Sequence, residues 1–250
     1  MTELEMIVDL HLNMDRLGPG SQDETLKALE YVNLQQNGIL NIADFGCGTG
    51  NQSLLLAEHL KARITAVDLF PKFLNKLIER AKNSALSNKI DTRVEDLNDL
   101  SIEPYSLDLI WSEGAIYNIG FENGIKSWKK YLKPGGFLAV TDITWITGRR
   151  PKTIEDYWSG IYPEIDRASS KIQILEDNGY TLTGYFYLKK KSWLTNYYHP
   201  LESAFDHFLR RHDNAKLAHK IVEENLFEIQ QYQKYGKYYS YGFYIARSDD

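Results

Sequence analysis

The chain has 250 residues, of which 43% are hydrophobic and 25% charged, and its formal net charge of −5 gives a sequence pI near 5.7. This composition is ordinary for a folded globular protein and excludes disordered and fibrous classes. The acidic balance argues against a nucleic-acid partner, which would need many cationic contacts to phosphate. A single cysteine excludes a disulfide framework, and no apolar run is long enough to cross a bilayer, so we expect a cytoplasmic protein without a membrane partner.

The N-terminal segment MTELEMIVDLHLNM carries acids early and lacks both a basic start and an apolar centre, so it does not resemble a secretory signal. The turn-forming run GPGS follows it. After this turn the pattern predicts a helix over residues 23–32, with Ser21 as its N-cap.

Short apolar runs then alternate with helical patterns, which is the signature of βαβ units and a parallel sheet. The segments NQSLLLAEHLKA, PKFLNKLIERAKNSAL and NGIKSWKKYL repeat apolar residues at the spacing of helices packed on such a sheet. The predicted strands cover residues 39–45, 62–69, 90–95, 107–113 and 136–143.

Beyond these units we predict a helical stretch over 154–178, a strand over 181–188, a long helical stretch over 200–235 and a final strand KYYSYGFYIARS. The predicted fold is α/β: a Rossmann-like, doubly wound, mostly parallel seven-stranded sheet with an antiparallel last strand, helices on both faces and an aromatic, helical lid. We expect one domain, divided into an N-terminal lid and helix (1–38), a cofactor-binding core (39–145) and an acceptor-site cap with the last two strands (146–250).

The stretch DFGCGTG joins the first strand to a helix through a glycine-rich turn, which directs backbone N–H groups and a positive helix end at one spot. Its GxGxG spacing differs from the GxGxxG of the dinucleotide fingerprint. Asp68 closes the second strand, where a carboxylate suits the two hydroxyls of a ribose. Asp96 follows the third strand and could accept from an adenine amino group.

The set DFGCGTG, AVDL, VEDLNDL and LKPGGFLAV resembles the motif series of class I S-adenosylmethionine-dependent methyltransferases over about residues 41–142. The resemblance implies that S-adenosylmethionine is the cofactor. It also implies a role for each matching position. The methionine end would lie by Asp44, Gly46, Cys47, Gly48 and Gly50; the ribose by Asp68 and Leu69; the adenine by Asp96 and Leu97; and the cofactor's amino-acid portion by Glu113, at the substrate mouth.

The segment NMDRLGPGSQDETLKAL resembles the lid of a subgroup of small-molecule methyltransferases. In that resemblance Gly18 and Ser21 of the GPGS turn help to cover the cofactor, and Arg16 meets its carboxylate. A turn that only caps the following helix is the alternative interpretation.

Methyl transfer requires alignment of the acceptor and exclusion of water, so no nucleophilic catalytic group is needed. By family analogy, the lack of NPPY or DPPY after the fourth strand disfavours adenine and glutamine acceptors, and the single cysteine excludes a thiol nucleophile outside the cofactor loop. Thirteen of the 17 tyrosines lie beyond residue 150. We predict a small-molecule acceptor and aromatic rings around it; the candidate rings are Tyr117, Trp145, Trp158, Tyr197 and Tyr198.

The catalytic base is not assigned by the sequence; its candidates are Glu113, Tyr117 and His199. We expect no metal. Two other functions stay open: an NAD(P)-dependent oxidoreductase, disfavoured by the glycine spacing, and a non-catalytic module that binds S-adenosylmethionine. The chain is expected to be a monomer or a homodimer.

Overall fold

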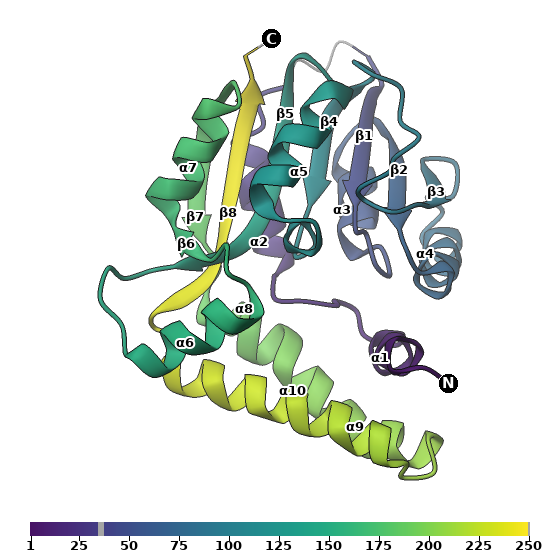
Figure 1. Ribbon diagram of the computed structural model, residues 1–250. Helices are drawn as coiled ribbons and strands as arrows, with labels where there is room; N and C mark the ends of the chain where they lie inside the picture. The colour runs from purple at the N-terminus through teal and green to yellow at the C-terminus, as the bar shows by residue number, and fades with distance from the viewer. Residues whose placement is uncertain (35–37, 250) are drawn as a thin grey trace.

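The computed structural model describes residues 1–34 and 38–249 (Figure 1). The predicted divisions 1–38 and 146–250 therefore include residues 35–37 and 250, which lie outside the described residues. Within the described part the strands form one eight-stranded sheet. They are β1 (Leu40–Phe45), β2 (Ala62–Asp68), β3 (Ile90–Val94), β4 (Leu107–Ser112), β5 (Leu132–Trp145), β6 (Asp166–Arg167), β7 (Tyr180–Tyr187) and β8 (Tyr239–Ser248).

The strand order is β3-β2-β1-β4-β5-β8-β7, and the two-residue β6 pairs with β5 off this path. Strands β1 to β5 pair in parallel, whereas β8 is antiparallel to both β5 and β7. The predicted fold class, a mostly parallel sheet with an antiparallel last strand, is confirmed. Of the last two strands, β8 alone is antiparallel to the central strands. Because β8 lies between β5 and β7 and pairs antiparallel with both, β7 runs parallel to β5.

Helical elements lie between all successive strands except β3 and β4. They are α1 (Glu3–His11), α2 (Gln22–Glu30), α3 (Asn51–His59), α4 (Pro71–Asn83), η1 (Ile116–Asn118), α5 (Phe121–Trp128), η2 (Lys129–Tyr131), α6 (Lys152–Ile161), α7 (Ala168–Asp177), α8 (Lys190–Trp193), η3 (Leu194–Tyr198), α9 (His199–Arg211) and α10 (Lys216–Tyr235). The predicted N-cap of α2 is confirmed, because the Ser21 hydroxyl accepts from the Glu24 N–H at 3.2 Å.

Side chains alternate along the central strands and bury two separate cores. On one face Ile42 and Ala139 pack with α2, α3 and α4. On the other face Phe45 and Val140 pack with α5 and α7. Helices therefore cover both faces of the sheet, as Figure 1 shows.

A third core lies beyond the carboxyl ends of the central strands, where the long strands β5 and β8 carry Ile143, Trp145 and Tyr239 into a helical cap. The cap consists of α6, α8, α9 and α10, and α1 packs on α9 and α10 (Figure 1). Because β5 and β8 pair continuously from the sheet into this core, the cap is attached directly to two strands of the central sheet.

Two predicted helical stretches are each divided in the structure, which corrects their boundaries. In the predicted stretch 154–178 the first helix, α6, ends at Ile161, because Tyr162 precedes Pro163 and takes a non-helical conformation with φ −141° and ψ 87°. The second helix, α7, starts at Ala168. The stretch 200–235 is interrupted at Asp213 and Asn214, whose φ values of 50° and 51° cannot continue a right-handed helix.

One ion pair is fully buried beneath the cap. The Lys171 ammonium of α7 contacts the Asp142 carboxylate of β5, and their side chains are 1% and 0% exposed. The Tyr162 hydroxyl also donates to Asp142 at 3.1 Å, and Lys171 donates to the Glu164 carbonyl at 3.1 Å. Burial raises the pKa of the Asp142 carboxyl to about 6, although the neighbouring Lys171 lowers it.

We predict that Lys171→Met lowers the free energy of unfolding by about 3–5 kcal/mol, because it leaves the Asp142 charge buried without a cation. The double variant Lys171→Met with Asp142→Asn should recover part of that loss, since the charge is then absent. Urea unfolding at pH 8 measures both effects. Equal stabilities of the single and double variants would show that the charge pairing is not what stabilises this region.

Candidate active site

The glycine loop after β1 lies between two other segments of the chain. Gly46 and Gly48 have φ values of 74° and 53°, which favour glycine. A Cβ on Gly46 would lie 2.2 Å from the Ala115 Cβ, and one on Gly48 would lie 2.5 Å from the Leu17 Cδ1. The loop backbone is therefore packed closely against the segment after β4 and against the segment that follows α1.

Asp68, at the end of β2, accepts hydrogen bonds from the neighbouring turns and can still accept further ones. Its Oδ2 accepts from the Gly48 N–H and its Oδ1 from the Phe70 N–H, both at 2.9 Å. A carboxylate has about four lone-pair sites, so each oxygen can accept one more donor. Burial raises the pKa of this carboxyl, whereas its backbone hydrogen bonds lower it. The residue is suited to a ligand that presents two adjacent hydroxyls.

Glu113, directly after β4, accepts four hydrogen bonds. Oε2 accepts from Arg16 Nη1 and Gln52 Nε2, each at 3.1 Å, and Oε1 accepts from Thr25 Oγ1 at 2.7 Å and Trp111 Nε1 at 3.0 Å. All its lone-pair sites are used. The geometry therefore makes Glu113 an anchor for the buried Arg16 guanidinium, and it disfavours Glu113 as the base that accepts a substrate proton.

Asp44 lies buried beneath the glycine loop. The Ser53 hydroxyl donates to its Oδ2 at 2.6 Å. Burial, together with the negative charges of Glu113 and Asp68, raises the pKa of Asp44 to about 7, although the hydrogen bond from Ser53 lowers it.

Two adjoining cavities lie at this carboxyl edge of the sheet. The larger, of about 570 Å³, contains eight of the predicted site residues: Gly46, Gly48, Asp68, Leu69, Asp96, Leu97, Tyr117 and Tyr197. The smaller, of about 60 Å³, is lined by six of them: Arg16, Gly18, Gly46, Cys47, Gly48 and Glu113. Leu17, Gly46, Gly48 and Gly114 border both cavities, so the two lie side by side at the glycine loop.

Helix α1 supplies a wall of the larger cavity that the sequence prediction did not include: Leu4, Ile7, Val8 and His11. The helix is fixed to the cap through Asp9, which contacts Arg211 at 2.7 Å and His212 at 2.9 Å. A capping box formed by Thr2 and Glu5 starts it. The T-x-x-E pattern in MTELEM is a sequence signal for this helix start, but it does not indicate which face meets the cavity.

His11 is the one histidine among the cavity-lining residues of the described chain. Its Nδ1 lies 2.8 Å from the Ile7 carbonyl, which requires a proton on Nδ1 and leaves Nε2 as the acceptor. Burial lowers the pKa of this imidazole. Its ring stacks on Tyr197 with a centroid distance of 6.4 Å.

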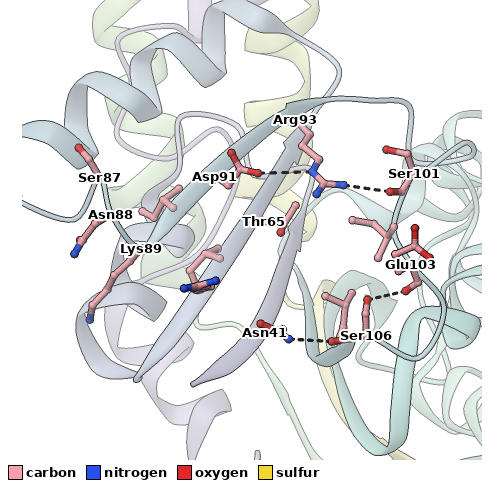
Figure 2. Close-up of a pocket in the computed structure, with 15 residues that line it drawn as sticks. Asn41, Thr65, Ser87, Asn88, Lys89, Asp91, Arg93, Ser101, Glu103 and Ser106 are labelled. Atoms are coloured by element: carbon pink, nitrogen blue, oxygen red, sulfur yellow. Dashed lines mark hydrogen bonds and ion pairs between the residues drawn. The ribbon is translucent and has the colours of Figure 1, made fainter. Parts of the chain in front are cut away.

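Another hollow, of about 610 Å³, lies near the amino-terminal ends of β1 and β2 (Figure 2). Its polar groups are bonded to one another: Arg93 contacts Asp91 at 3.8 Å and the Ser101 carbonyl at 3.2 Å, and Asn41 donates to the Ser106 carbonyl at 3.3 Å. It contains none of the predicted site residues. Ligands of open α/β sheets bind at the carboxyl ends of strands, so we assign the active site to the opposite edge.

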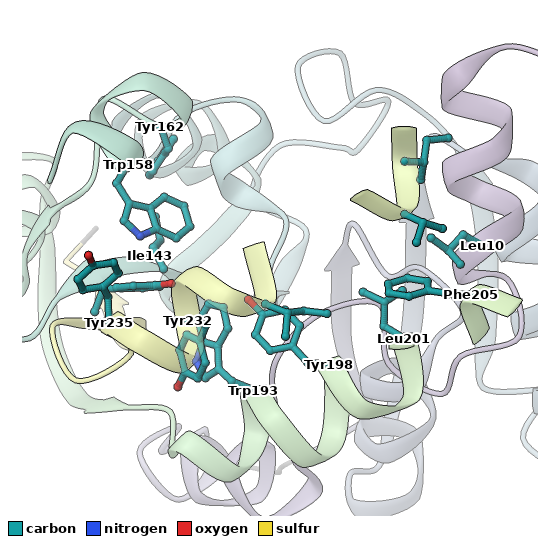
Figure 3. Packing of buried hydrophobic residues seen from close by; sticks show 14 of the residues in the cluster. Leu10, Ile143, Trp158, Tyr162, Trp193, Tyr198, Leu201, Phe205, Tyr232 and Tyr235 are labelled. Carbon is teal, nitrogen blue, oxygen red and sulfur yellow. The ribbon is translucent and has the colours of Figure 1, made fainter. Parts of the chain in front are cut away.

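The predicted aromatic residues divide between cavity and core. Tyr117 and Tyr197 border the larger cavity, whereas Trp145, Trp158 and Tyr198 are buried in the cap core. Figure 3 shows Tyr198 beside Trp193 and Tyr232 in that core.

The other predicted residues lie outside the cavity walls. His199 is exposed at the start of α9, and Ser21 caps α2. Gly50 is the N-cap of α3. Cys47, by contrast, lines the smaller cavity and is a buried thiol whose pKa is raised by burial. Across residues 1–34 and 38–249, no group of three or more His, Cys, Asp or Glu side chains is placed to hold a metal ion. In the same residues no helix is long and apolar enough to cross a membrane.

Residues 42–136 match the family model described as a methyltransferase domain. A phosphoethanolamine N-methyltransferase from Plasmodium falciparum is 29% identical over 129 residues, which are 50% of this chain and 47% of that protein. A trans-aconitate 2-methyltransferase from Streptomyces avermitilis is 37% identical over 101 residues, 39% of this chain and 37% of that protein. The chain thus spans less than half the length of both relatives, and their names state different acceptors.

Among solved structures, a methyltransferase from Geobacter sulfurreducens in complex with S-adenosyl-L-homocysteine has a TM-score of 0.82 and 15% identity. The superposition covers 97% of each chain. At this level of identity the likeness shows the shared fold.

We predict that Asp44 makes stability depend on pH. Its folded-state pKa of about 7 lies above the usual 3.8, so its contribution to stability is complete below about pH 4 and is lost as the pH rises through 7. The asparagine of Asp44→Asn cannot ionise. Between pH 4 and pH 8 the free energy of unfolding should therefore fall in both proteins, but by about 2–4 kcal/mol less in Asp44→Asn than in the unsubstituted protein.

Urea unfolding at several pH values measures this difference, and Asp206→Asn, at an exposed position of α9, is the control. Parallel stability curves for the unsubstituted protein and Asp44→Asn would contradict the prediction.

Proposed function

We propose that this chain, which carries a methyltransferase domain at residues 42–136, transfers a methyl group from S-adenosylmethionine to a small-molecule acceptor. One observation carries the proposal. The glycine loop, Asp68 and Asp96 come from the ends of three successive strands and border a single cavity of about 570 Å³. The strand-end acids and the loop are the groups that a nucleoside-bearing ligand requires there.

The residues present fit the nucleoside of this cofactor. Asp68 retains one free acceptor site on each oxygen for the two ribose hydroxyls. Leu69 and Leu97 border the same cavity and would cover the faces of the adenine ring. Asp96 uses Oδ1 to accept from the backbone and side-chain amides of Asn98, at 2.8 and 3.1 Å, so Oδ2 would receive the adenine amino group.

The smaller cavity fits the amino-acid end. The Arg16 guanidinium borders it and would bind a carboxylate, while Glu113 and Thr25 hold that guanidinium in place. When bound, the cofactor supplies an electrophilic methyl group: the acceptor lone pair forms the new bond to carbon while the carbon–sulfur pair goes to sulfur. The protein's contribution is then alignment and exclusion of water. Helix α1 and Leu17 cover the site and serve that role.

An acceptor that must lose a proton needs a base near the cavity. His199 lies on the exposed start of α9, and Glu113 has no unused lone pair. Burial and the charge of Glu228 raise the pKa of Tyr117, so its hydroxyl stays protonated and acts as a hydrogen-bond donor. His11 borders the cavity with Nε2 as an acceptor and a lowered pKa, and we therefore infer that His11 accepts the proton when the reaction requires it.

A small acceptor agrees with how the site is enclosed. The larger cavity is walled by α1, the loop after β4 and Tyr197 of η3, and the nucleoside would fill part of it. The net charge of −5 disfavours a nucleic-acid acceptor.

We predict that S-adenosylmethionine and S-adenosylhomocysteine bind with micromolar dissociation constants in calorimetric titrations and that NADH does not bind. Asp68→Ala should weaken binding of both by about 1–3 kcal/mol, because it removes charge-assisted hydrogen bonds to the ribose. Asp206→Ala, an exposed acid on α9, is the matched control. Unchanged affinity in a folded Asp68→Ala protein would contradict the ribose assignment, and binding of NADH alone would overturn the proposed function.

A further inference from the structure

A half-buried carboxylate without a cationic partner lies in the cap near the active-site cavity. Glu228 of α10 accepts a hydrogen bond from the Tyr198 hydroxyl at 2.9 Å through Oε1. Within the described residues no lysine, arginine or histidine forms an ion pair with it. The acid one turn earlier in the same helix, Glu224, does have a cationic partner, because it pairs with Lys220 at 3.6 Å. Burial raises the pKa of the Glu228 carboxyl.

Three tyrosines connect Glu228 to the cavity. Tyr117 and Tyr197 border the cavity directly. Tyr241 lies against Gly114, which borders both cavities, since a Cβ at Gly114 would be 3.5 Å from the Tyr241 ring. The Tyr198 ring, whose hydroxyl donates to Glu228, has its centroid 5.1 Å from that of Tyr197, so the carboxylate lies one ring behind the cavity wall. In agreement with this position, the Glu228 charge is, after burial, among the causes that raise the pKa of all three hydroxyls.

The tyrosine hydroxyls around Glu228 are neutral, so they do not neutralise its negative charge. The other carboxylate near Tyr241, Asp142, already has Lys171 as its partner. A carboxylate removed from water without a cation is unfavourable, and a ligand cation would remove that cost. Aromatic faces around a carboxylate are also the surfaces that attract organic cations.

We propose that the acceptor is a small molecule with a positively charged ammonium group, which lies among the rings of Tyr117, Tyr197 and Tyr241 with its charge facing Glu228. This proposal rests on the proposed function, since it names the acceptor class of the same site. Acidic acceptors are excluded by the same reasoning, because their charge would meet the unpaired carboxylate.

Calorimetric titration at pH 7 in saturating S-adenosylhomocysteine tests the proposal with matched pairs of probes. Benzylammonium is compared with benzyl alcohol, and 2-phenylethylammonium with 2-phenylethanol. Each pair has the same ring and nearly the same size but differs in charge. We expect each ammonium to bind at least about tenfold more tightly than its alcohol.

Glu228→Gln should reduce that preference to less than about threefold, because the amide keeps the shape and the Tyr198 hydrogen bond but removes the charge. Glu224→Gln, on the exposed side of the same helix, is the matched control and should keep the full preference. Tyr117→Leu is a second variant at a 41% exposed position, and it should weaken the ammonium probes more than the alcohols.

Equal affinities for ammonium and alcohol in the unsubstituted protein would overturn the proposal, as would a full preference in folded Glu228→Gln. The comparison of ammonium and alcohol probes in the unsubstituted protein tests the proposal even if Glu228→Gln does not fold. Circular dichroism would detect such a failure to fold. The titration with S-adenosylhomocysteine separates the two proposals. Failure to bind it contradicts the proposed function, whereas its binding without any preference for cations contradicts only the acceptor class.

Discussion

The active-site edge of this protein depends on burying three acidic side chains, Asp44, Asp68 and Glu113, near one another. Each is compensated differently. Glu113 is held by one guanidinium and three neutral donors, Asp68 by two backbone N–H groups, and Asp44 by the Ser53 hydroxyl. Because buried polar groups are costly unless bonded, these contacts fix the segments that provide the donors. The segment after α1, helices α2 and α3, and the glycine loop are all positioned in this way.

The same balance determines which ligand the crevice favours. Arg16 forms an ion pair with Glu113, whereas Asp44 and Asp68 have hydroxyl and backbone N–H donors, so the local charge is negative. The pyrophosphate of a nicotinamide dinucleotide would add two negative charges to that crevice. S-adenosylmethionine carries a sulfonium and an ammonium beside its single carboxylate, which we propose that Arg16 binds. The electrostatics therefore disfavour the dinucleotide for a reason independent of the glycine spacing.

The sequence predicted the central sheet and the glycine loop well because both are encoded locally. Alternating apolar residues specify each strand, and acids at strand ends meet at one edge whatever the rest of the chain does. The predictions for the cap were weaker. Tyr197 and Tyr198 are adjacent, yet one borders the cavity and the other is buried, because neighbouring residues of a helical turn point in different directions.

Residues whose role arises from packing between distant segments were not predictable. His11 and Glu228 lie far apart in the sequence on ordinary helical patterns. Glu228 in particular follows two exposed acids, Glu223 and Glu224, from which no local pattern distinguishes it. Only the docking of α10 against Tyr198 in the cap core removes Glu228 partly from water, and only the docking of α1 brings His11 to the cavity.

The two proposals together require one site to hold two cations, and the distribution of acids explains how this is feasible. Two unit charges about 4 Å apart repel by about 4 kcal/mol at an effective dielectric constant of 20. Asp68 borders the larger cavity and Glu113 the smaller one, on the side where we propose that the cofactor binds, whereas Glu228 lies behind the tyrosines of the cap. Carboxylates on both sides offset the repulsion without neutralising either cation at the reacting centre. An ammonium nitrogen has no lone pair, so an acceptor that is methylated at nitrogen first gives up a proton, for which His11 is the proposed base. Methyl transfer then restores a positive charge on the side of the site where Glu228 lies, and the attraction of Glu228 for that charge lowers the barrier of the transfer step.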